Sequence, residues 1–387
     1  MFKKYITKFY NLEKTFYQKS VDAYFDRDYE KDVVVYQKQH PKDDFGRSIA
    51  QDKCQTYPFK KDLFKLNCIA VLLGPILMVG LLMKRRFYVK ESDNSSIVCF
   101  SCLNLPGALP EALSNKAPFF LKTSDCSYYL RTKDISFLLR FFIRSIGSPF
   151  LALRVLLRVS KFRAIIDSFS QLEAIVLTRE FDATSSTLTQ YCHENGVKLY
   201  NFMQGEAFCS PRTSFFHFDK CFVWDQHYAD SFVRFGAIPE QFEVSTPRCL
   251  QTISGVNVEQ IIDYTYYLSG DPDEELPIIG KAIAILASKG FRCAVRPHPR
   301  WSNMEMVNKS FKGIEIQDTS SVSIDESILM TKNAISLYST VLIQAYHNGI
   351  IVVIDDLSAP AKYKNLEQFR YIMLNKPHLL LSELIKS

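Results

Sequence analysis

The chain has 387 residues, of which 47% are hydrophobic and 23% charged, and its formal net charge is +6. This length exceeds the usual size of one domain and predicts two domains with sizeable cores. The positive excess is too small and too dispersed for a dedicated nucleic-acid-binding protein, but it suits an acidic substrate or an anionic membrane surface.

Ten cysteines are scattered along the chain, and only Cys99 and Cys102 form a close pair, in the segment CFSC. No second pair follows at metal-ligand spacing, so we interpret both as small hydrophobic residues rather than as a zinc or redox site. The pattern favours a reducing compartment. The charged, aromatic N-terminus shows no secretory signal, and we expect a cytoplasmic location.

The first 90 residues are expected to form an irregular and apolar N-terminal region, with a strand-like run, VVVY, at Val33–Tyr36. The segment Leu66–Met83 is uncharged and apolar and precedes three basic residues. It is slightly short for a membrane span and is interrupted by Gly74, Pro75 and Gly80. Three alternatives stay open for this segment: a buried helix, a helix at the membrane interface, and a true span.

A basic stretch follows at residues 137 to 169. In it, apolar residues alternate with six basic ones: Arg140, Arg144, Arg154, Arg158, Lys161 and Arg163. Helices of this kind can lie on an anionic bilayer, and they can equally present a solvated basic face over a core. Either interpretation places positive charge beside the first domain.

From Ser95 onward, strand-like and helix-like segments alternate, which predicts a parallel sheet with right-handed crossovers. In such sheets ligands bind outside the carboxyl ends of the strands. Polar residues stand at two of these ends in the first domain. Asp182, with Glu180 nearby, follows the strand in AIVLTREFD, and the next strand is followed by Gln204, Gly205 and Glu206.

A linker-like segment, CLQTISGVN, predicts a division into domains 1–250 and 251–387, sharing a cleft. The second domain repeats the alternation, and we expect its terminal helix to cross back to the first domain. Two of its turns can hold a phosphate. One, in FRCAVRPHPR, carries Arg296 and His298; at the other, Ser339 and Thr340 offer hydroxyls and backbone N–H groups where a helix begins.

With these motifs, RPHPR and YST, the layout resembles the GT-B glycosyltransferases, whose two Rossmann-like domains have parallel sheets facing a cleft. It is similar to bacterial sialyltransferases and polysialyltransferases, which carry a His-Pro motif and a later Ser-Ser/Thr motif. Capsule and teichoic-acid polymerases that use CDP-linked polyols share a related plan. The likeness covers roughly residues 95 to 370.

The resemblance implies that the donor's phosphate is held by His298 with Pro299, and by Ser339 with Thr340. Because these groups stabilise the leaving phosphate, no metal or other cofactor is implied, and the CMP-sugar donor is a substrate. Arg296 and Arg300 either bind the donor's carboxylate or phosphate or are solvated. His298 could also serve a tight turn, and Ser339 and Thr340 could only cap the following helix.

A general base is needed to deprotonate the acceptor hydroxyl. Sialyltransferases of this kind use an acidic residue in a two-acid-plus-Gly motif, which this sequence lacks in its usual form. Glu206 is the first choice, since Gln204 and Gly205 precede it where polyol-phosphate polymerases tend to have a His-Gly pair. Asp182 is the second choice. An ordinary loop carboxylate and a structural carboxylate, respectively, are the alternatives.

The leading hypothesis is an inverting, metal-independent glycosyltransferase. It would move sialic acid or a related nonulosonic acid from a CMP-sugar to a glycan or glycolipid of a bacterial lipopolysaccharide or capsule, at the inner face of the cell membrane. One alternative keeps the GT-B fold but uses a CDP-polyol or UDP-sugar donor. The others are a sugar-nucleotide epimerase and a non-catalytic nucleotide-sugar sensor.

Overall fold

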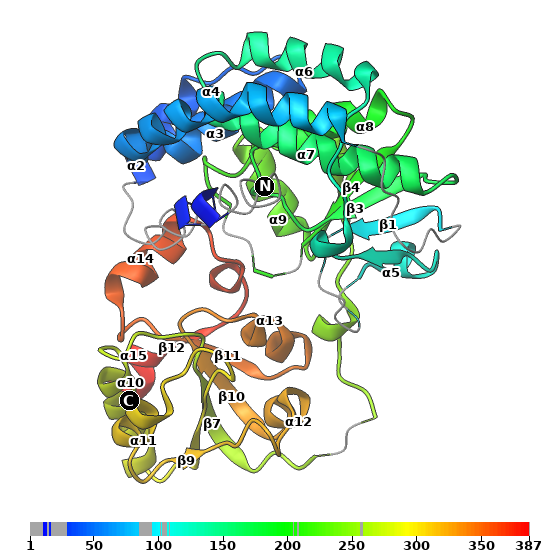
Figure 1. Cartoon of the computed structure of the whole chain (residues 1–387). Helices are drawn as coiled ribbons and strands as arrows, with labels where there is room; N and C mark the ends of the chain where they lie inside the picture. The colour runs from blue at the N-terminus through cyan, green and yellow to red at the C-terminus, as the bar shows by residue number, and fades with distance from the viewer. Residues whose placement is uncertain are drawn as a thin grey trace. The chain divides into compact units, whose positions relative to one another are not determined.

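The computed structural model describes residues 11–13, 15–16, 29–84, 95–100, 102, 107, 109–203, 205–206, 209–255 and 258–386. The chain forms two compact units, Met1–Ser245 and Thr246–Ser387, so the division lies close to the predicted one at residues 250 and 251. Each unit contains one six-stranded sheet in which every pair of neighbouring strands is parallel (Figure 1). The predicted α/β class with two Rossmann-like units is confirmed.

The sheet of unit 1 has the strand order β2-β1-β3-β4-β5-β6. Short apolar runs such as IVCF and AIVL form its central strands, and all four residues of each are buried, as expected of a parallel sheet covered on both faces. The strands are β1 (Ile97–Phe100), β2 (Phe119–Leu121), β3 (Ala174–Leu177), β4 (Lys198–Phe202), β5 (Lys220–Val223) and β6 (Phe242–Val244).

The described helices of unit 1 cover this sheet and begin at recognisable signals. Asp43 caps one helix by accepting from the Gly46 N–H, and Pro149 occupies the first turn of another. They are α2 (Tyr29–Gln37), α3 (Asp44–Thr56), η1 (Tyr57–Phe59), α4 (Lys60–Met83), α5 (Glu111–Ser114), η2 (Thr123–Asp125), α6 (Thr132–Arg144), α7 (Pro149–Ser168), α8 (Ser185–His193), α9 (Gln226–Arg234) and η3 (Pro239–Gln241).

The longest buried helix is α7, which lies between the sheet and the outer helices α4 and α6 (Figure 1). Both interpretations of its basic residues, a face on a bilayer and a solvated face, are wrong. All four basic side chains of this helix are buried: Arg154, Arg158, Lys161 and Arg163. Carboxylates from other segments pair with the arginines, as described below. The basic residues of α6, Arg140 and Arg144, are exposed.

The apolar helix α4 is only partly buried. Leu66, Ala70, Leu77 and Leu81 point into the unit, whereas much of the opposite face is exposed. Of the helical stretches in the described residues, Asp44–Met83 alone is long and apolar enough to cross a membrane by length and composition, and 22% of its most apolar window is buried. Complete burial of this helix, one of the three alternatives, is therefore wrong.

The sheet of unit 2 has the order β12-β11-β10-β7-β8-β9. Numbered within the unit, this is the 3-2-1-4-5-6 order of dinucleotide-binding Rossmann sheets, and it reverses between β7 and β10. The strands are β7 (Ile262–Tyr267), β8 (Cys293–Arg296), β9 (Glu315–Ile316), β10 (Thr331–Ser336), β11 (Ile351–Ile354) and β12 (Leu379–Leu380).

The helices of unit 2 pack closely on its sheet and on one another. A Cβ atom on Gly280 would lie 2.1 Å from the carbonyl oxygen of Ser310, so only glycine permits the contact between α10 and α11. The helices are η4 (Arg248–Leu250), α10 (Leu276–Ser288), α11 (Met304–Ser310), α12 (Ile324–Leu329), α13 (Thr340–His347), α14 (Pro360–Gln368), η5 (Ile372–Asn375) and α15 (Leu381–Lys386).

The terminal helix α15 remains in unit 2. It packs against α10, and Nζ of Lys289 donates to the carbonyl oxygens of Leu384 (3.1 Å) and Ile385 (3.0 Å). The cation thus occupies the C-terminal end of the helix, where the helix dipole favours it. That this helix crosses back to the first domain stays a prediction.

Candidate functional site

The carboxyl ends of β8, β7 and β10 lie side by side where the strand order of unit 2 reverses. Tyr267 of β7 is in register with Arg296 of β8, and Oγ of Ser336 in β10 donates to the Tyr267 carbonyl oxygen (2.8 Å). Both predicted phosphate-binding turns follow these strand ends, with His298 after β8 and Ser339 after β10. The topology therefore gathers both turns at the edge where Rossmann sheets bind ligands.

Hydrogen bonds within its own loop fix the tautomer of the His298 ring. The backbone N–H of Arg300 donates to Nδ1 of His298 (3.1 Å), and the His298 N–H donates to Oγ of Ser302 (2.8 Å). Since Nδ1 accepts, the neutral ring carries its hydrogen on Nε2. Burial, and secondarily the charge of Arg300, lowers the pKa of His298 below its ordinary value. At pH 7 the ring is a neutral N–H donor, and its contact with a phosphate stays a prediction.

The loop also presents Trp301, which the sequence reasoning missed. Its side chain is 68% exposed, its ring centroid lies 6.1 Å from that of His298, and its Cβ is 3.5 Å from the position that a Cβ on Gly270 would occupy. Gly270 has a φ of +116°, so glycine is needed there on conformational grounds as well. An exposed indole beside the His298 turn offers a flat surface for a base or sugar ring. Its position directly after RPHPR is the sequence feature that could have identified it as a candidate site residue.

The other residues of the RPHPR motif point in different directions. Arg296 is buried, and its guanidinium donates to the Val322 carbonyl oxygen (2.9 Å) and, at 3.5 Å, to Oε1 of Gln317. It ties β8 to the segment that precedes α12. Pro299 and Arg300 are exposed. Of the two arginines, Arg300 is the one that the structure leaves in a position to meet a ligand from solvent.

Ser339 is the N-cap of α13, and its Oγ accepts from the Val341 N–H (3.2 Å). The hydroxyl of Tyr371 donates to the Ser339 carbonyl oxygen (3.3 Å), which fixes the turn from the side. Thr340 is the first residue of the helix. Ser339 therefore caps the helix, as one of its two predicted roles requires. A helix N-terminus also favours an anion through its unsatisfied N–H groups, so the predicted phosphate role remains compatible with the cap.

In unit 1, Glu206 follows β4 and accepts a hydrogen bond from the hydroxyl of Tyr228 on α9 (2.7 Å). Burial raises the pKa of Glu206 to about 8, although the bond from Tyr228 acts in the opposite direction. Gly205 before it is exposed, and Gln204 lies outside the described residues. A carboxyl group that titrates near neutral pH is suited to accept a proton from a substrate hydroxyl.

Asp182 after β3 lies in a cluster of ion pairs. Its carboxylate oxygens lie 2.9 Å from Nη2 of Arg154 and 3.5 Å from Nη2 of Arg158, and the Thr184 N–H donates to Oδ1. Burial alone would raise the pKa of Asp182, but Arg154, Arg158 and Arg179 outweigh it and hold the pKa well below its ordinary value. Such a carboxylate is a weak base, so the ion pairs favour the structural alternative for Asp182, and its role as the base stays a prediction.

The described residues contain no group of three or more His, Cys, Asp and Glu that could hold a metal ion. Asp355, after β11, accepts from the Tyr266 hydroxyl (2.8 Å) and from the Leu357 N–H (2.9 Å), which is a turn-forming role. Cys99 is buried in β1, and Sγ of Cys102 lies 3.4 Å from the Val176 carbonyl oxygen. Both cysteines act as small packed residues, as predicted.

No protein-family model and no curated protein matches the chain. Among solved structures, it is similar to HepE of Anabaena in complex with UDP (10% identity, TM-score 0.38, covering 67% of this chain and 80% of that one). It is also similar to UDP-N-acetylglucosamine 2-epimerase from Rickettsia bellii (12%, 0.40, 66% and 77%). A third is a UDP-forming trehalose-phosphate synthase from Burkholderia xenovorans (10%, 0.40, 76% and 93%). At these identities and TM-scores the likeness says nothing about the substrate of this chain.

Proposed function

We propose that the chain is an inverting glycosyltransferase, in which unit 2 binds a nucleotide-sugar donor and Glu206 of unit 1 is the general base. Two chemical devices, one in each unit, support the proposal. One is a neutral imidazole N–H and a capped helix N-terminus at the point where a Rossmann sheet reverses its strand order. The other is a carboxyl group with a pKa of about 8 at the carboxyl end of a strand.

The proposed reaction uses these devices in one displacement. The bond between the anomeric carbon and the donor's phosphate oxygen breaks, and its electron pair stays on the nucleotide, whose growing charge the N–H and hydroxyl donors of His298, Ser339 and Thr340 stabilise. The acceptor's oxygen forms the new bond to carbon, and its proton passes to the carboxylate of Glu206. In this proposal these donors, rather than a metal ion, stabilise the leaving group.

For the donor we place UDP-sugars before CMP-linked sialic acid or a CDP-polyol. This order follows the names of the similar structures, which mention UDP or a UDP-sugar, and it decides only which nucleotide is tested first. The proposed acceptor is a glycan or glycolipid of a bacterial surface polymer, modified at the cytoplasmic side of the membrane. A sugar-nucleotide epimerase and a nucleotide-sugar sensor are the competing functions.

We expect UDP to stabilise the protein by about 2.7 kcal/mol when its concentration is one hundred times its Kd. The measurement is the unfolding temperature by calorimetry with UDP, CMP, CDP or uridine. Uridine is the control, because it lacks the phosphates that His298 and Ser339 would bind. A shift with CMP alone would restore the sialyltransferase hypothesis. The absence of a shift with every nucleotide, or an equal shift with uridine, would refute the phosphate site.

Product analysis with the nucleotide-sugar of the bound base then separates the competing functions. A transferase releases nucleotide only as an acceptor glycan is consumed. An epimerase converts the sugar without an acceptor, and a sensor leaves the nucleotide-sugar unchanged.

His298→Ala should remove most of the nucleotide's stabilisation without unfolding unit 2. Unchanged nucleotide binding in this variant would contradict the role assigned to the imidazole.

Ser339→Ala is expected to weaken nucleotide binding about tenfold, because it removes a hydroxyl and loosens the helix N-terminus that faces the phosphate. The matched control is Ser323→Ala, since Ser323 caps α12 by accepting from the Glu326 N–H (3.1 Å). Both variants should lose about 1 kcal/mol of stability. Isothermal titration should find the loss of affinity in Ser339→Ala alone. Equal affinities in the two variants would show that Ser339 caps the helix and does not bind the phosphate.

A further inference from the structure

Helix α4 has two apolar faces, and among the described residues only one of them packs against the rest of unit 1. The inner face packs against α7, where Oδ1 of Asn67 accepts from the Phe150 N–H (2.9 Å). The outer face is exposed at helical spacing along the whole length of α4. Its exposed apolar residues, which we term the α4 stripe, are Phe64, Cys68, Val71, Leu72, Pro75, Ile76, Val79 and Met83.

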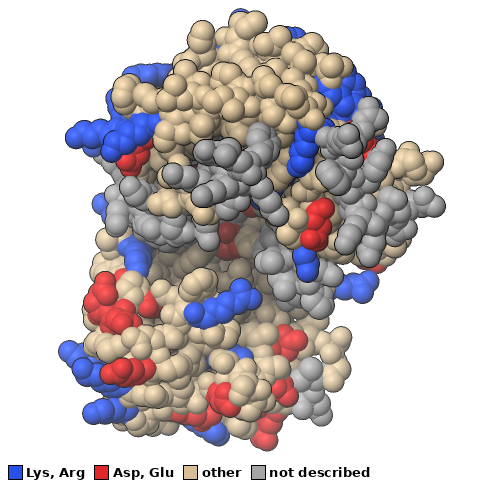
Figure 2. All heavy atoms as spheres, in the orientation of Figure 1, with Lys and Arg blue, Asp and Glu red and all other residues tan. Residues whose placement is uncertain are grey.

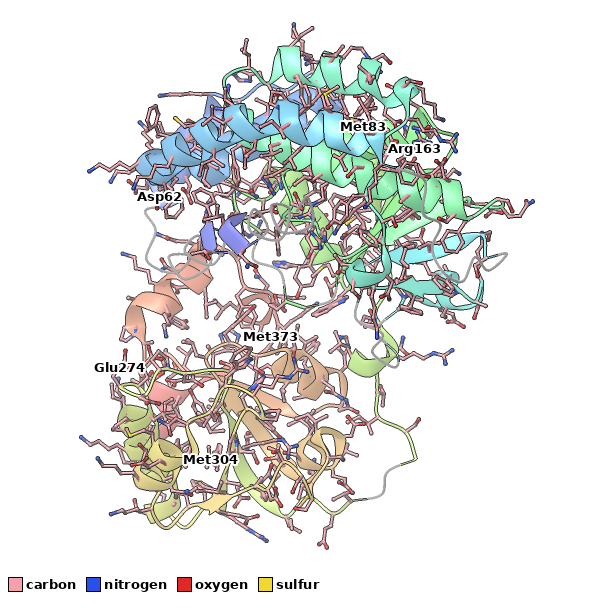
Figure 3. All side chains as sticks on the ribbon, viewed as in Figure 1. Asp62, Met83, Arg163, Glu274, Met304 and Met373 are labelled. Carbon is pink, nitrogen blue, oxygen red and sulfur yellow. The ribbon has the colours of Figure 1, made fainter. Side chains whose placement is uncertain are left out.

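The stripe is longer and more apolar than the surface of a monomeric soluble protein normally shows. Its central residues Leu72 and Ile76 are 72% and 66% exposed. The stripe extends from Phe64 to Met83, over more than five turns of α4. The whole helix has 24 residues and is roughly 36 Å long. Figure 3 labels Asp62 and Met83 at its two ends. Leu139, Ile143 and Ile146 add exposed apolar side chains on and just after α6, which also packs on α7.

Positive charge lies at the ends of the stripe and is missing from its middle. Lys60, Lys61 and Lys65 stand on the first turns of α4 together with one carboxylate, Asp62, Lys84 follows its last residue, and the sequence between Lys65 and Lys84 carries no charge. Figure 2 shows the corresponding uncharged expanse over the outer helices of unit 1, with Lys and Arg near its margins. Arg140 and Arg144 contribute less charge, because they pair with Glu194 and Asp43.

We propose that the α4 stripe is a membrane-binding surface, on which α4 lies in the plane of an anionic phospholipid bilayer. Apolar side chains enter the boundary between headgroups and acyl chains, while the flanking lysines bind the phosphate groups of the lipids. The inference concerns unit 1 alone and does not depend on the proposed enzymatic activity.

Two features favour this occupant over the others. A membrane span would pull α4 off α7, exposing Leu66, Ala70, Leu77 and Leu81 and breaking the bond from the Leu130 N–H to the Leu81 carbonyl oxygen (3.2 Å). A second copy of the chain would meet this stripe through the same patch under two-fold symmetry. Antiparallel α4 helices would then bring the lysines of one copy beside Lys84 of the other, which is repulsive.

The test is flotation of the full chain with vesicles of phosphatidylcholine, with or without phosphatidylglycerol. We expect binding to the anionic vesicles that weakens at high salt, because lysine contacts to the surface are screened. Ile76→Glu should lower the partition coefficient at least about tenfold, since it puts a carboxylate into the apolar boundary. Lys60→Gln, Lys61→Gln and Lys65→Gln should each lower binding to anionic vesicles about fivefold.

The matched control is Ile278→Glu, the same change at a residue of α10 in unit 2 that is 46% exposed. It should bind vesicles as the unaltered protein does, and all variants should keep the same unfolding temperature and nucleotide affinity. Equal vesicle binding by Ile76→Glu and Ile278→Glu would overturn the proposal. So would a chain that fails to float with either vesicle but forms a dimer that Ile76→Glu dissociates, as seen by sedimentation.

Discussion

Glu206→Gln is expected to lower kcat about a thousandfold while leaving the Kd of the nucleotide unchanged. The substitution keeps the size of the side chain and its ability to accept from the Tyr228 hydroxyl, but it removes the group that takes the acceptor's proton. In the proposed function the motifs of unit 2 bind the nucleotide, so its Kd should be unaffected. The measurement is initial rate against acceptor concentration at saturating donor, with nucleotide affinity determined by titration.

The pH profile gives this prediction a second readout. Glu206 acts as a base only when ionised, so kcat/KM should rise with pH through about 8 and level off above it. The Tyr228 hydroxyl lowers the pKa of Glu206, and Tyr228→Phe should therefore move this rise to higher pH. Tyr228→Phe is the informative control, because it removes a hydrogen bond to the same carboxyl group and leaves the base in place.

Stability should change in the direction opposite to activity. Because the pKa of Glu206 is raised on folding, the folded protein binds this proton more tightly than the unfolded chain. Stability is therefore lost as pH rises from the ordinary pKa of a glutamate, about 4.3, to about 8. Glu206→Gln removes that loss and should be at least as stable as the unaltered protein at pH 8. A fully active glutamine variant with an unchanged pH profile would exclude Glu206 as the base.

Much of the fold follows from local sequence patterns. Short runs of buried apolar residues, such as AIVL and IVVI, alternate with helical segments and predict two parallel sheets. Val33–Tyr36 was predicted as a strand because β-branched residues favour one. It lies instead in α2, where Val35 and Tyr36 pack on the cluster of Ala50, Cys54 and Phe215. Those partners are distant in sequence, and no local pattern contains them.

The burial of α7 could not be predicted for the same reason. Its arginines have the spacing of a solvated face, and their partners Glu13, Asp52, Asp134 and Asp182 come from separate segments of the chain. Only the tertiary fold brings these carboxylates to the helix. A single sequence shows charge but not the neighbours that neutralise it.

The candidate site divides along the same line. The capping serine and the Pro-flanked histidine are local features, and their turns appear where the motifs predicted them. The raised pKa of Glu206 depends on burial beside α9, and the lowered pKa of Asp182 depends on arginines of another helix. Neither can be read from spacing. The cleft shared by the two domains stays a prediction.

Arg163→Met should destabilise unit 1 by about 3 to 5 kcal/mol. Arg163 and Asp134 are each 1% exposed, and Nη2 of Arg163 lies 2.7 Å from Oδ1 of Asp134 (Arg163 is labelled in Figure 3). The same guanidinium reaches Asp167 (3.4 Å), and the Tyr191 hydroxyl donates to Asp134 (2.9 Å). The methionine fills similar space but leaves Asp134 buried without its cation, which is the costly outcome, whereas Asp167 keeps its ion pair with Arg131 (2.7 Å).

Unit 1 can be followed by itself, because the sequence has two tryptophans, one in each unit. In a Trp301→Phe background, intrinsic fluorescence reports Trp224, which is buried in unit 1. We expect the midpoint of its thermal transition to fall by about 10 °C in Arg163→Met. The matched control is Arg140→Met on α6, whose partner Glu194 is also a carboxylate (2.6 Å) but whose side chain is 51% exposed.

Arg140→Met should cost less than about 1 kcal/mol, because an exposed ion pair is solvated and screened. A double variant, Arg163→Met with Asp134→Asn, should recover part of the lost stability, since it removes the charge of the carboxylate that has lost its cation. If Arg163→Met and Arg140→Met lower the midpoint equally, the buried network does not hold α6, α7 and α8 together. If the double variant recovers nothing, the loss comes from packing of the guanidinium rather than from an unpaired carboxylate.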